Sequence, residues 1–183
     1  LTIVSIYVNP AQFTPGEDLS NYPRDLEKDL EALSKFQVDV VFFPDDKQMY
    51  PQGFSTFILE DNFSHRLEGK SRPEHFKGVL TIVGKLFNII RPSHAFFGEK
   101  DAQQIRVLQK MVTDLNYNLQ IVPCPIVREA NGLAMSSRNI YLSENNREKA
   151  GVIHRSLKKA EEMLVQGYHS VVEIREVVIA MIK

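Results

Sequence analysis

Apolar residues recur at helical spacing in the stretch from Val79 to Ile90. They fall at positions i, i+3, i+4 and i+7, which is typical of a helix with a broad apolar face. The run is too long for one strand, and Pro92 ends it because proline disfavours helical backbone in the residue before it. We therefore predict a helix that is largely buried in a core, with a polar entry formed by Arg72 and His75.

Shorter apolar runs, rich in β-branched and aromatic residues, predict strands on both sides of this helix. They cover residues 2–8, 38–43, 94–97 and 119–122, and a further short strand over 55–59 lies apart from the main sheet. Helices are predicted around Leu26, Leu30 and Leu33 and from about Ala102 to Leu115. Strand and helix alternate, so we expect an α/β protein with a parallel sheet and right-handed crossovers.

The strand–helix alternation stops near Val127, which predicts two domains, 1–126 and 127–183. In the second, Asn131–Gly132 predicts a tight turn. A helix capped by Ser143 is predicted to continue to about Val165, with Gly167 just past its end. Residues 170–173 predict a capping box that opens a last amphipathic helix. Both ends of the chain look cut, because it begins with Leu1 in a strand and ends inside this helix, so we expect a piece of a longer chain.

Composition narrows the class of protein. With 43% hydrophobic and 25% charged residues, the 183-residue chain is typical of a soluble globular protein. A formal net charge of −1 gives no reason to expect a nucleic-acid or anionic-membrane partner. No stretch predicts a membrane span or a signal peptide, so a cytoplasmic location is expected. The single cysteine, Cys124, follows a predicted strand and is expected to be a buried structural thiol.

The first candidate site is the polar cluster Gly98-Glu99-Lys100-Asp101. It follows a predicted strand and precedes a helix, which is where ligands bind in open α/β sheets. Backbone amides and Lys100 suit a phosphate, and the Asp101 carboxylate suits ribose hydroxyls. The local sequence equally allows a plain helix N-terminus, with Asp101 as the cap and Lys100 in solvent.

Further polar groups lie elsewhere in the chain. Ser136, Ser137 and Arg138 offer the donors that oxyanions require, although a surface loop would look the same. Uncharged amides near strand ends suit a small polar substrate; they belong to Asn9, Gln12 and Gln104. No histidine has a partner at metal-ligand spacing, so no metal site is predicted. Walker A, G-x-G-x-x-G and G-x-S-x-G motifs are absent from the sequence.

Four stretches taken in order are more specific than any one cluster: VNPAQF at 8–13, RPEHFKGV at 72–79, FGEKDAQQ at 97–104 and VREANGLAMSSRN at 127–139. Together they resemble the pantothenate synthetase family, ligases that join pantoate to β-alanine using ATP. Residues 18–24 and 49–51 also match, and the resemblance runs from Leu1 to about Leu164. It implies a Rossmann-like parallel sheet of the nucleotidyltransferase type, followed by a smaller α+β domain that closes over ATP.

The resemblance also implies a role for each matching residue. The ATP ribose and phosphates would be held by Gly98, Glu99, Lys100 and Asp101, and the adenine would be bordered by Val127 and Met135. The triphosphate would contact a KMSKS-like loop formed by Ser136, Ser137 and Arg138. Pantoate would bind to Gln12 and Gln104, with Gln12 also near β-alanine, in a pocket lined by Asn9, Tyr22, Arg72 and His75. Catalysis would rest on Lys100, Arg138 and Ser136.

The implied reaction proceeds from Mg²⁺–ATP and pantoate to pantoyl adenylate, and then to pantothenate when β-alanine displaces AMP. A cytoplasmic homodimer is implied as well. The family's His-x-Gly-His motif precedes the equivalent of Leu1 and is missing from the sequence, so the literal chain is expected to have little or no synthetase activity. Two alternatives stay open: a silent fragment that binds nucleotide or dimerises, and another adenylyltransferase of the same fold.

Overall fold

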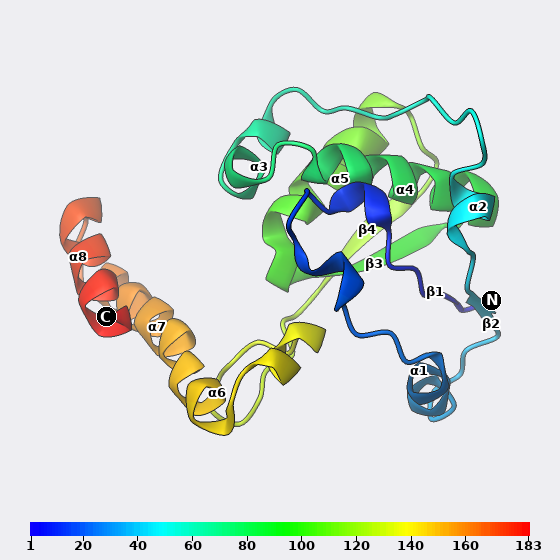
Figure 1. Ribbon diagram of the computed structural model, residues 1–183. Helices are drawn as coiled ribbons and strands as arrows, with labels where there is room; N and C mark the ends of the chain where they lie inside the picture. Colours follow the sequence, from blue (N-terminus) through cyan, green and yellow to red (C-terminus); the bar gives the residue numbers. More distant parts are fainter. The chain divides into compact units, whose positions relative to one another are not determined.

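The computed structural model describes residues 1–183, and the chain divides into two compact units, Leu1–Cys124 and Pro125–Lys183 (Figure 1). The sequence placed the boundary between 126 and 127. The binding functions expected of the two segments are not tested by this division and stay predictions. The two units are described separately below.

The first unit alternates strands and helices, and its strands pair in parallel. Strand β1 (Ile3–Ser5) pairs with β2 (Val40–Phe42), and β3 (His94–Gly98) pairs with β4 (Gln120–Cys124). The helices are α1 (Leu26–Leu33), α2 (Asp46–Met49), α3 (Glu68–Ser71), α4 (His75–Ile90) and α5 (Ala102–Asp114). Four short 3₁₀ helices complete the unit: η1 (Pro10–Gln12), η2 (Asp18–Ser20), η3 (Phe63–His65) and η4 (Glu99–Asp101).

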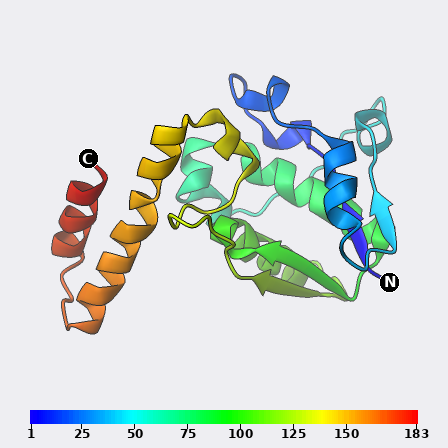
Figure 2. The ribbon, with the colours of Figure 1, turned by 90° about the horizontal axis from the view of Figure 1, so that it is seen from below.

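Helix α4 is the centre of the core, as the apolar pattern predicts. Its buried residues pack with those of α5, and the ring of Phe87 contacts that of Phe97 on β3, which lies beside the helix (Figure 2). The helix ends at Ile90 as expected, because Arg91 adopts the left-handed conformation (φ 51°) and Pro92 follows. The α/β class and the parallel pairing are confirmed.

The sheet differs from the prediction in continuity, since the strands form two separate two-stranded sheets. The strand predicted over 2–8 ends at Ser5, because the backbone turns to bury Asn9 against α4. The strand predicted over 55–59 does not form. Instead, the backbone amide of Ile58 donates to the Thr81 hydroxyl of α4 at 3.0 Å, so this segment lies along the helix rather than in a sheet.

Burial of the predicted elements is also less complete than the sequence indicates. Strand β3 buries one face only: Ala95 and Phe97 pack on the core, whereas Phe96 is 68% exposed. Helix α5 ends at Asp114, and Leu115, the last residue of the predicted helix, is 53% exposed. Cys124 is half-buried at the end of β4.

The second unit is helical apart from an isolated antiparallel bridge between Arg128 and Ala134, so the expected α+β character is slight. Its elements are η5 (Ser137–Tyr141), α6 (Glu144–Ala150), α7 (Val152–Val165) and α8 (Val171–Ile182), with α7 and α8 side by side (Figure 1). The hydroxyl groups of Ser143 and Ser170 cap α6 and α8 as predicted, and Gly167 (φ 91°) follows the end of α7. Of the capping box predicted over residues 170–173, the structure shows the bond from the Glu173 amide to the Ser170 hydroxyl.

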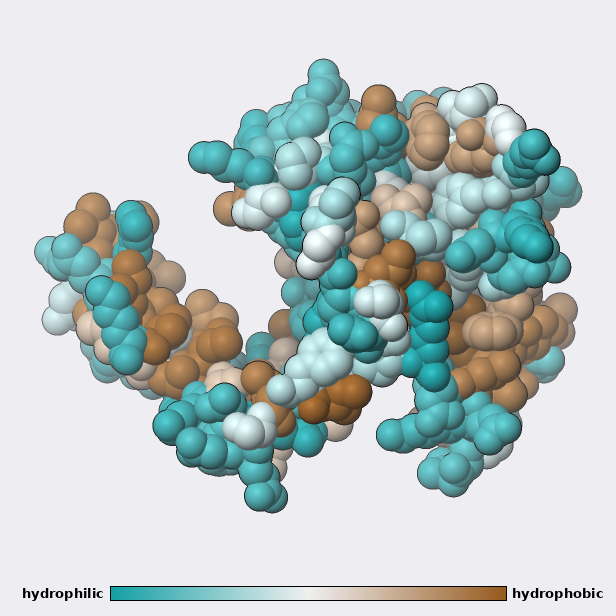
Figure 3. Space-filling view, in the orientation of Figure 1, coloured by the Kyte–Doolittle hydropathy of each residue, from teal (hydrophilic) through white to brown (hydrophobic).

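The single helix expected from Ser143 to Val165 is broken at Gly151. A Cβ at this position would lie 2.4 Å from the Asn131 carbonyl oxygen, so the chain passes close to the preceding turn where the helix is interrupted. Figure 3 shows apolar side chains exposed on the helices of this unit. Val165 on α7 is 84% exposed and Val171 on α8 is 77% exposed. None of the helices in either unit combines the length and the apolar character needed to span a bilayer.

Candidate functional site

The predicted substrate residues of the first unit gather where η1 meets the start of α4. Asn9 is only 1% exposed, and its Nδ2 donates to the Gly78 carbonyl oxygen at 3.1 Å. Its Oδ1 accepts from the Tyr50 hydroxyl at 2.7 Å and from the Ala11 amide at 3.2 Å. The amide group of Asn9 is therefore committed to the protein, and its contribution to the site is to hold η1 in place.

Gly78 allows this close contact between η1 and α4. A Cβ at Gly78 would lie 2.1 Å from the Ala11 carbonyl oxygen and 2.6 Å from the Gln12 Cα, distances that no side chain tolerates. Glycine is required at this position because the backbone of η1 comes so close to α4, and not because of a special backbone conformation, since Gly78 is helical. Because Gly78 in the RPEHFKGV stretch has no side chain, the backbone of the NPAQ stretch can pack directly against α4.

Arg72 and His75 hold the backbone of Gln12. The Gln12 carbonyl oxygen accepts from Arg72 Nη2 at 3.3 Å and lies 2.9 Å from His75 Nδ1, and His75 is buried. The side chain of Gln12 makes one long contact, with its Oε1 at 3.5 Å from Asn9 Nδ2. The structure therefore brings together four of the predicted substrate residues: Asn9, Gln12, Arg72 and His75.

Two acids surround the Arg72 guanidinium. Glu17 makes a two-point ion pair with it, with Nε–Oε1 and Nη2–Oε2 distances both 2.7 Å, and Glu68 Oε1 lies 2.8 Å from Nη1. The hydrogen bonds from Arg72 lower the pKa of Glu17 from 4.5 to about 2, and the bonds to Glu17 raise the pKa of Arg72. Sequence reasoning missed Glu17 because 55 residues separate it from its partner.

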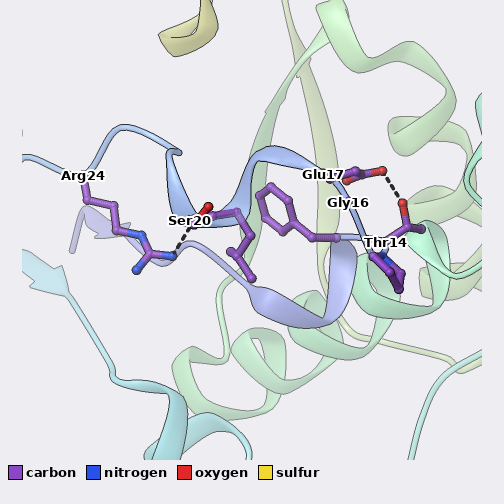
Figure 4. Close-up of a pocket in the computed structure, with 8 residues that line it drawn as sticks. Thr14, Gly16, Glu17, Ser20 and Arg24 are labelled. Carbon is purple, nitrogen blue, oxygen red and sulfur yellow. Dashed lines mark hydrogen bonds between the residues drawn. The ribbon is translucent and has the colours of Figure 1, made fainter.

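An open pocket lies in the segment that carries Glu17 (Figure 4). Within it the Thr14 hydroxyl donates to Glu17 Oε1 at 2.7 Å, and Arg24 donates to the Leu19 carbonyl oxygen at 3.4 Å. None of the predicted site residues lines the pocket; the lining residues are Phe13, Thr14, Pro15, Gly16, Glu17, Leu19, Ser20 and Arg24. Tyr22 is half-buried nearby, with its ring 5.8 Å from that of Phe13.

The predicted nucleotide residues form the turn between β3 and α5. Lys100 and Asp101 are exposed, with Nζ 3.2 Å from Oδ1, and Glu99 is exposed beside them. Asp101 makes no side-chain cap on α5, so the alternative reading of this cluster as a capped helix N-terminus is wrong for Asp101. A Cβ at Gly98 would meet nothing within 4 Å, and its φ of −69° suits any residue. Neither strain nor crowding within the protein requires a glycine here, and the open space suits a ligand.

The two glutamines at the start of α5 differ. Gln104, the predicted pantoate residue, is half-buried. Gln103, which sequence reasoning passed over, donates from Nε2 to the carbonyl oxygens of Phe63 (2.9 Å) and Arg66 (2.6 Å). Its Oε1 accepts from the Glu68 amide at 3.0 Å. Gln103 therefore positions the backbone of Glu68, the second acid at Arg72, and no local motif marks this role.

In the second unit, the two residues predicted to border adenine are neighbours. The Met135 amide donates to the Val127 carbonyl oxygen at 2.9 Å, and their side chains are 55% and 65% exposed. The turn at Asn131–Gly132, with Gly132 at φ 91°, lies between Arg128 and Ala134, the two residues of the isolated antiparallel bridge. An exposed apolar pair of this kind suits the face of a planar ring.

The Ser136-Ser137-Arg138 loop opens η5. The Ser136 hydroxyl accepts from the Arg138 amide at 3.2 Å, and Ser137 and Arg138 are exposed. Asn139, buried behind the loop, donates to Glu129 Oε1 at 2.7 Å and to the Ala134 carbonyl oxygen at 3.1 Å.

Glu129 in turn pairs with Arg147 through two contacts of 2.7 and 2.8 Å, and the hydrogen bonds from Arg147 lower the pKa of Glu129. Asn139 and Glu129 thus support the Ser136-Ser137-Arg138 loop from behind. In the sequence they stand out only as members of the matching stretch 127–139.

The structure thus defines an α/β protein with parallel strand pairs and an open glycine–lysine–acid turn at the carboxyl end of a strand. The family model for pantoate-beta-alanine ligase matches residues 1–183. The chain belongs to the pantoate-beta-alanine ligase family.

Known relatives agree with this membership. The chain is 53% identical over 182 residues to the pantothenate synthetase of Acetivibrio thermocellus, covering all of this chain and 65% of that protein. The crystal structure of pantothenate synthetase from Thermus thermophilus superposes with a TM-score of 0.94 at 46% identity, over 98% of this chain and 65% of that one. The pantoate-beta-alanine ligase of Francisella tularensis, complexed with beta-gamma ATP and beta-alanine, has a TM-score of 0.81 at 38% identity over 98% and 67%. The chain thus spans about 65% of the length of the first relatives it matches.

Proposed function

We propose that the chain is part of an ATP-dependent ligase that condenses pantoate with β-alanine through a pantoyl-adenylate intermediate. The observation that carries this proposal is the match of the whole chain to the family, with the matching stretches forming the η1–α4 junction and the open turn after β3. The Francisella tularensis relative supports it, since that protein is complexed with both beta-gamma ATP and beta-alanine.

The reaction assigns a task to each matching group. The pantoate carboxylate attacks the α-phosphate of ATP, pyrophosphate leaves, and the β-alanine amine then attacks the activated carbonyl and releases AMP. Catalysis rests on positioning and on neutralising negative charge, for which Lys100, Ser136 and Arg138 supply the donors. Gly98, Glu99 and Asp101 complete the assignment to ATP in the first unit, and Val127, Met135 and Ser137 in the second.

Mg²⁺ belongs to the substrate, as the Mg²⁺–ATP complex. No group of three or more His, Cys, Asp or Glu side chains in the chain is arranged to hold a metal ion. Mg²⁺ retains water and takes phosphate oxygens readily, so delivery by the triphosphate fits this donor set. Pantoate is assigned to Gln12 and Gln104, with Asn9, Tyr22, Arg72 and His75 around them.

The domain roles follow the same division: residues 1–126 for nucleotide and pantoate, and residues 127–183 for the lid. The homodimer, the cytoplasmic location and the low activity of the literal chain stay predictions.

Calorimetric titration of the purified chain with Mg²⁺–ATP, alongside an assay of pyrophosphate release with and without pantoate, tests the proposal. We expect Mg²⁺–ATP to bind, and Lys100→Met to weaken it about tenfold or more because a charge-assisted phosphate contact is lost. Lys28→Met, at an exposed position of α1, is the matched control. Pantoate-dependent pyrophosphate release would establish the ligase and refute the prediction of low activity, whereas a chain that binds no nucleotide would contradict the proposal.

A further inference from the structure

The Arg72 guanidinium has no free pair of donors. Nε and Nη2 bind the two oxygens of Glu17, Nη1 binds Glu68, and Nη2 also donates to the Gln12 carbonyl oxygen. Four of the five N–H groups of the side chain are accounted for by these contacts. A carboxylate ligand is held best by two parallel N–H groups, and Glu17 already occupies that fork. A substrate carboxylate would therefore have to replace an acid of the protein.

The two acids differ in how firmly they are held. Glu68 lies one helical turn from Arg72, and its backbone amide is bound by Gln103. Glu17 lies in the segment 13–24, before α1. Apart from those to Arg72, its hydrogen bonds are with the hydroxyl group and the carbonyl oxygen of Thr14, three residues away. Gly16, next to it, has a φ of 91°, a Cβ there would meet no atom within 4 Å, and the adjoining pocket is open (Figure 4). None of the hydrogen bonds that join Asn9 and Gln12 to Arg72, His75 and Gly78 involves Glu17, so its departure from Arg72 leaves them intact.

We propose that Glu17 is an internal carboxylate that occupies the fork of Arg72 until a substrate carboxylate displaces it. The inference rests on the proposed function, which places Arg72 in the pocket for pantoate and β-alanine. It makes Glu17 a residue that sets affinity and selectivity: a ligand must present a planar carboxylate to compete, and each binding event releases the Glu17 carboxylate from Arg72. Both substrates carry such a group, so the shared chemistry is a small carboxylate.

The variant Glu17→Gln preserves the shape of the side chain and removes its charge. It therefore tells whether Glu17 competes with the substrate carboxylate for Arg72 or only supports the local structure. With the fork no longer neutralised, we expect the dissociation constant of the competing carboxylate ligand to fall roughly twofold to fivefold, the range of a partly exposed ion pair. Glu31→Gln, on α1, provides a matched control, since its side chain is exposed and removed from Arg72.

The experiment is a calorimetric titration of the full chain, Glu17→Gln, Glu31→Gln and the double variant Glu17→Gln/Arg72→Gln, with pantoate and β-alanine in separate arms. Tighter binding by Glu17→Gln alone, lost in the double variant, supports the inference, and the arm in which it occurs identifies the ligand. Unchanged or weaker binding by Glu17→Gln overturns it, and so does the absence of carboxylate binding by every variant. Mg²⁺–ATP binding, measured in the same samples, reports on the proposed function independently.

Hydrogen exchange on the unmodified chain provides a second measurement that needs no substitution. Saturation with the carboxylate ligand is expected to speed exchange of the amides of Gly16 and Glu17, because the Glu17 carboxylate leaves Arg72. Slower exchange of these two amides would mean that Glu17 remains on Arg72 and would overturn the inference.

Discussion

The η1–α4 junction and the turn after β3 are both polar and both match the same family, yet they are built in opposite ways. At the junction, buried Asn9 and His75 and the backbone of Gln12 are engaged by the protein itself. In the turn, Gly98 has empty space around it and Lys100 is exposed, paired only with its neighbour Asp101. The first region is therefore preformed by internal contacts, whereas the groups of the second are left open to solvent. Substitutions should accordingly affect stability at the first and binding at the second.

The largest difference is expected between two glycines. Gly78→Ala places a Cβ 2.1 Å from the Ala11 carbonyl oxygen and should lower the free energy of unfolding by about 3 kcal/mol, the cost of overpacking a closed contact. Gly98→Ala meets nothing within 4 Å and should change it by less than about 0.5 kcal/mol, while weakening nucleotide binding. Urea denaturation of both variants checks this pair, and equal stability losses would erase the proposed difference between the regions.

Asn9→Ala tests the junction by a different route. The substitution leaves the Tyr50 hydroxyl and the Gly78 carbonyl oxygen without their buried partner, so unfolding should become easier by about 2 kcal/mol. Denaturation midpoints of Asn9→Ala and of the exposed control Asn145→Ala provide the measurement. A variant as stable as the parent chain would show that Asn9 is held less firmly than its burial indicates.

Acid should weaken the ion pair of the junction. The pKa of Glu17 is lowered from 4.5, its ordinary value, to about 2 in the folded protein. The contribution of the ion pair to the free energy of unfolding is therefore complete above about pH 4.5 and declines as the pH falls toward 2. The unfolding free energy of the parent chain should exceed that of Glu17→Gln by about 1 kcal/mol near neutral pH, with the gap closing in acid. A gap that stays constant from pH 6 to pH 3 would argue against the ion pair.

Lys100→Met should have the smallest effect on stability. The ammonium group is exposed and its contact with Asp101 joins adjacent residues, so the unfolding free energy should change by less than about 0.5 kcal/mol. A thermal or urea unfolding curve that overlays the parent curve is the expected result. A clear loss of stability would place Lys100 among the structural groups and weaken its assignment to phosphate.

The sequence predicts elements that depend on local pattern and leaves out those that depend on distant contacts. Helix α4 with its end near Pro92, the serine caps of α6 and α8, and Gly167 after α7 follow from spacing and capping chemistry, and the structure confirms them. The missing strand over 55–59 could not be foreseen, because the bond from Ile58 to Thr81 is a tertiary contact that replaces strand pairing.

The same limit holds for the candidate site. The matching stretches name Asn9, Arg72 and Lys100, but only the structure shows that Asn9 is buried and Lys100 exposed. Glu17 and Gln103 act over separations of 55 and 35 residues, where no periodicity or motif spacing connects them to their partners.

The most direct test of the contrast between the two regions is the backbone amide spectrum of the chain during titration with Mg²⁺–ATP and, separately, with pantoate. The nucleotide is expected to shift the amides of Gly98 to Asp101 while those of Ala11 and Gln12 stay in place, and pantoate is expected to shift the amides around Gln12 and Glu17. Nucleotide binding that leaves the Gly98–Asp101 amides unmoved would contradict this contrast.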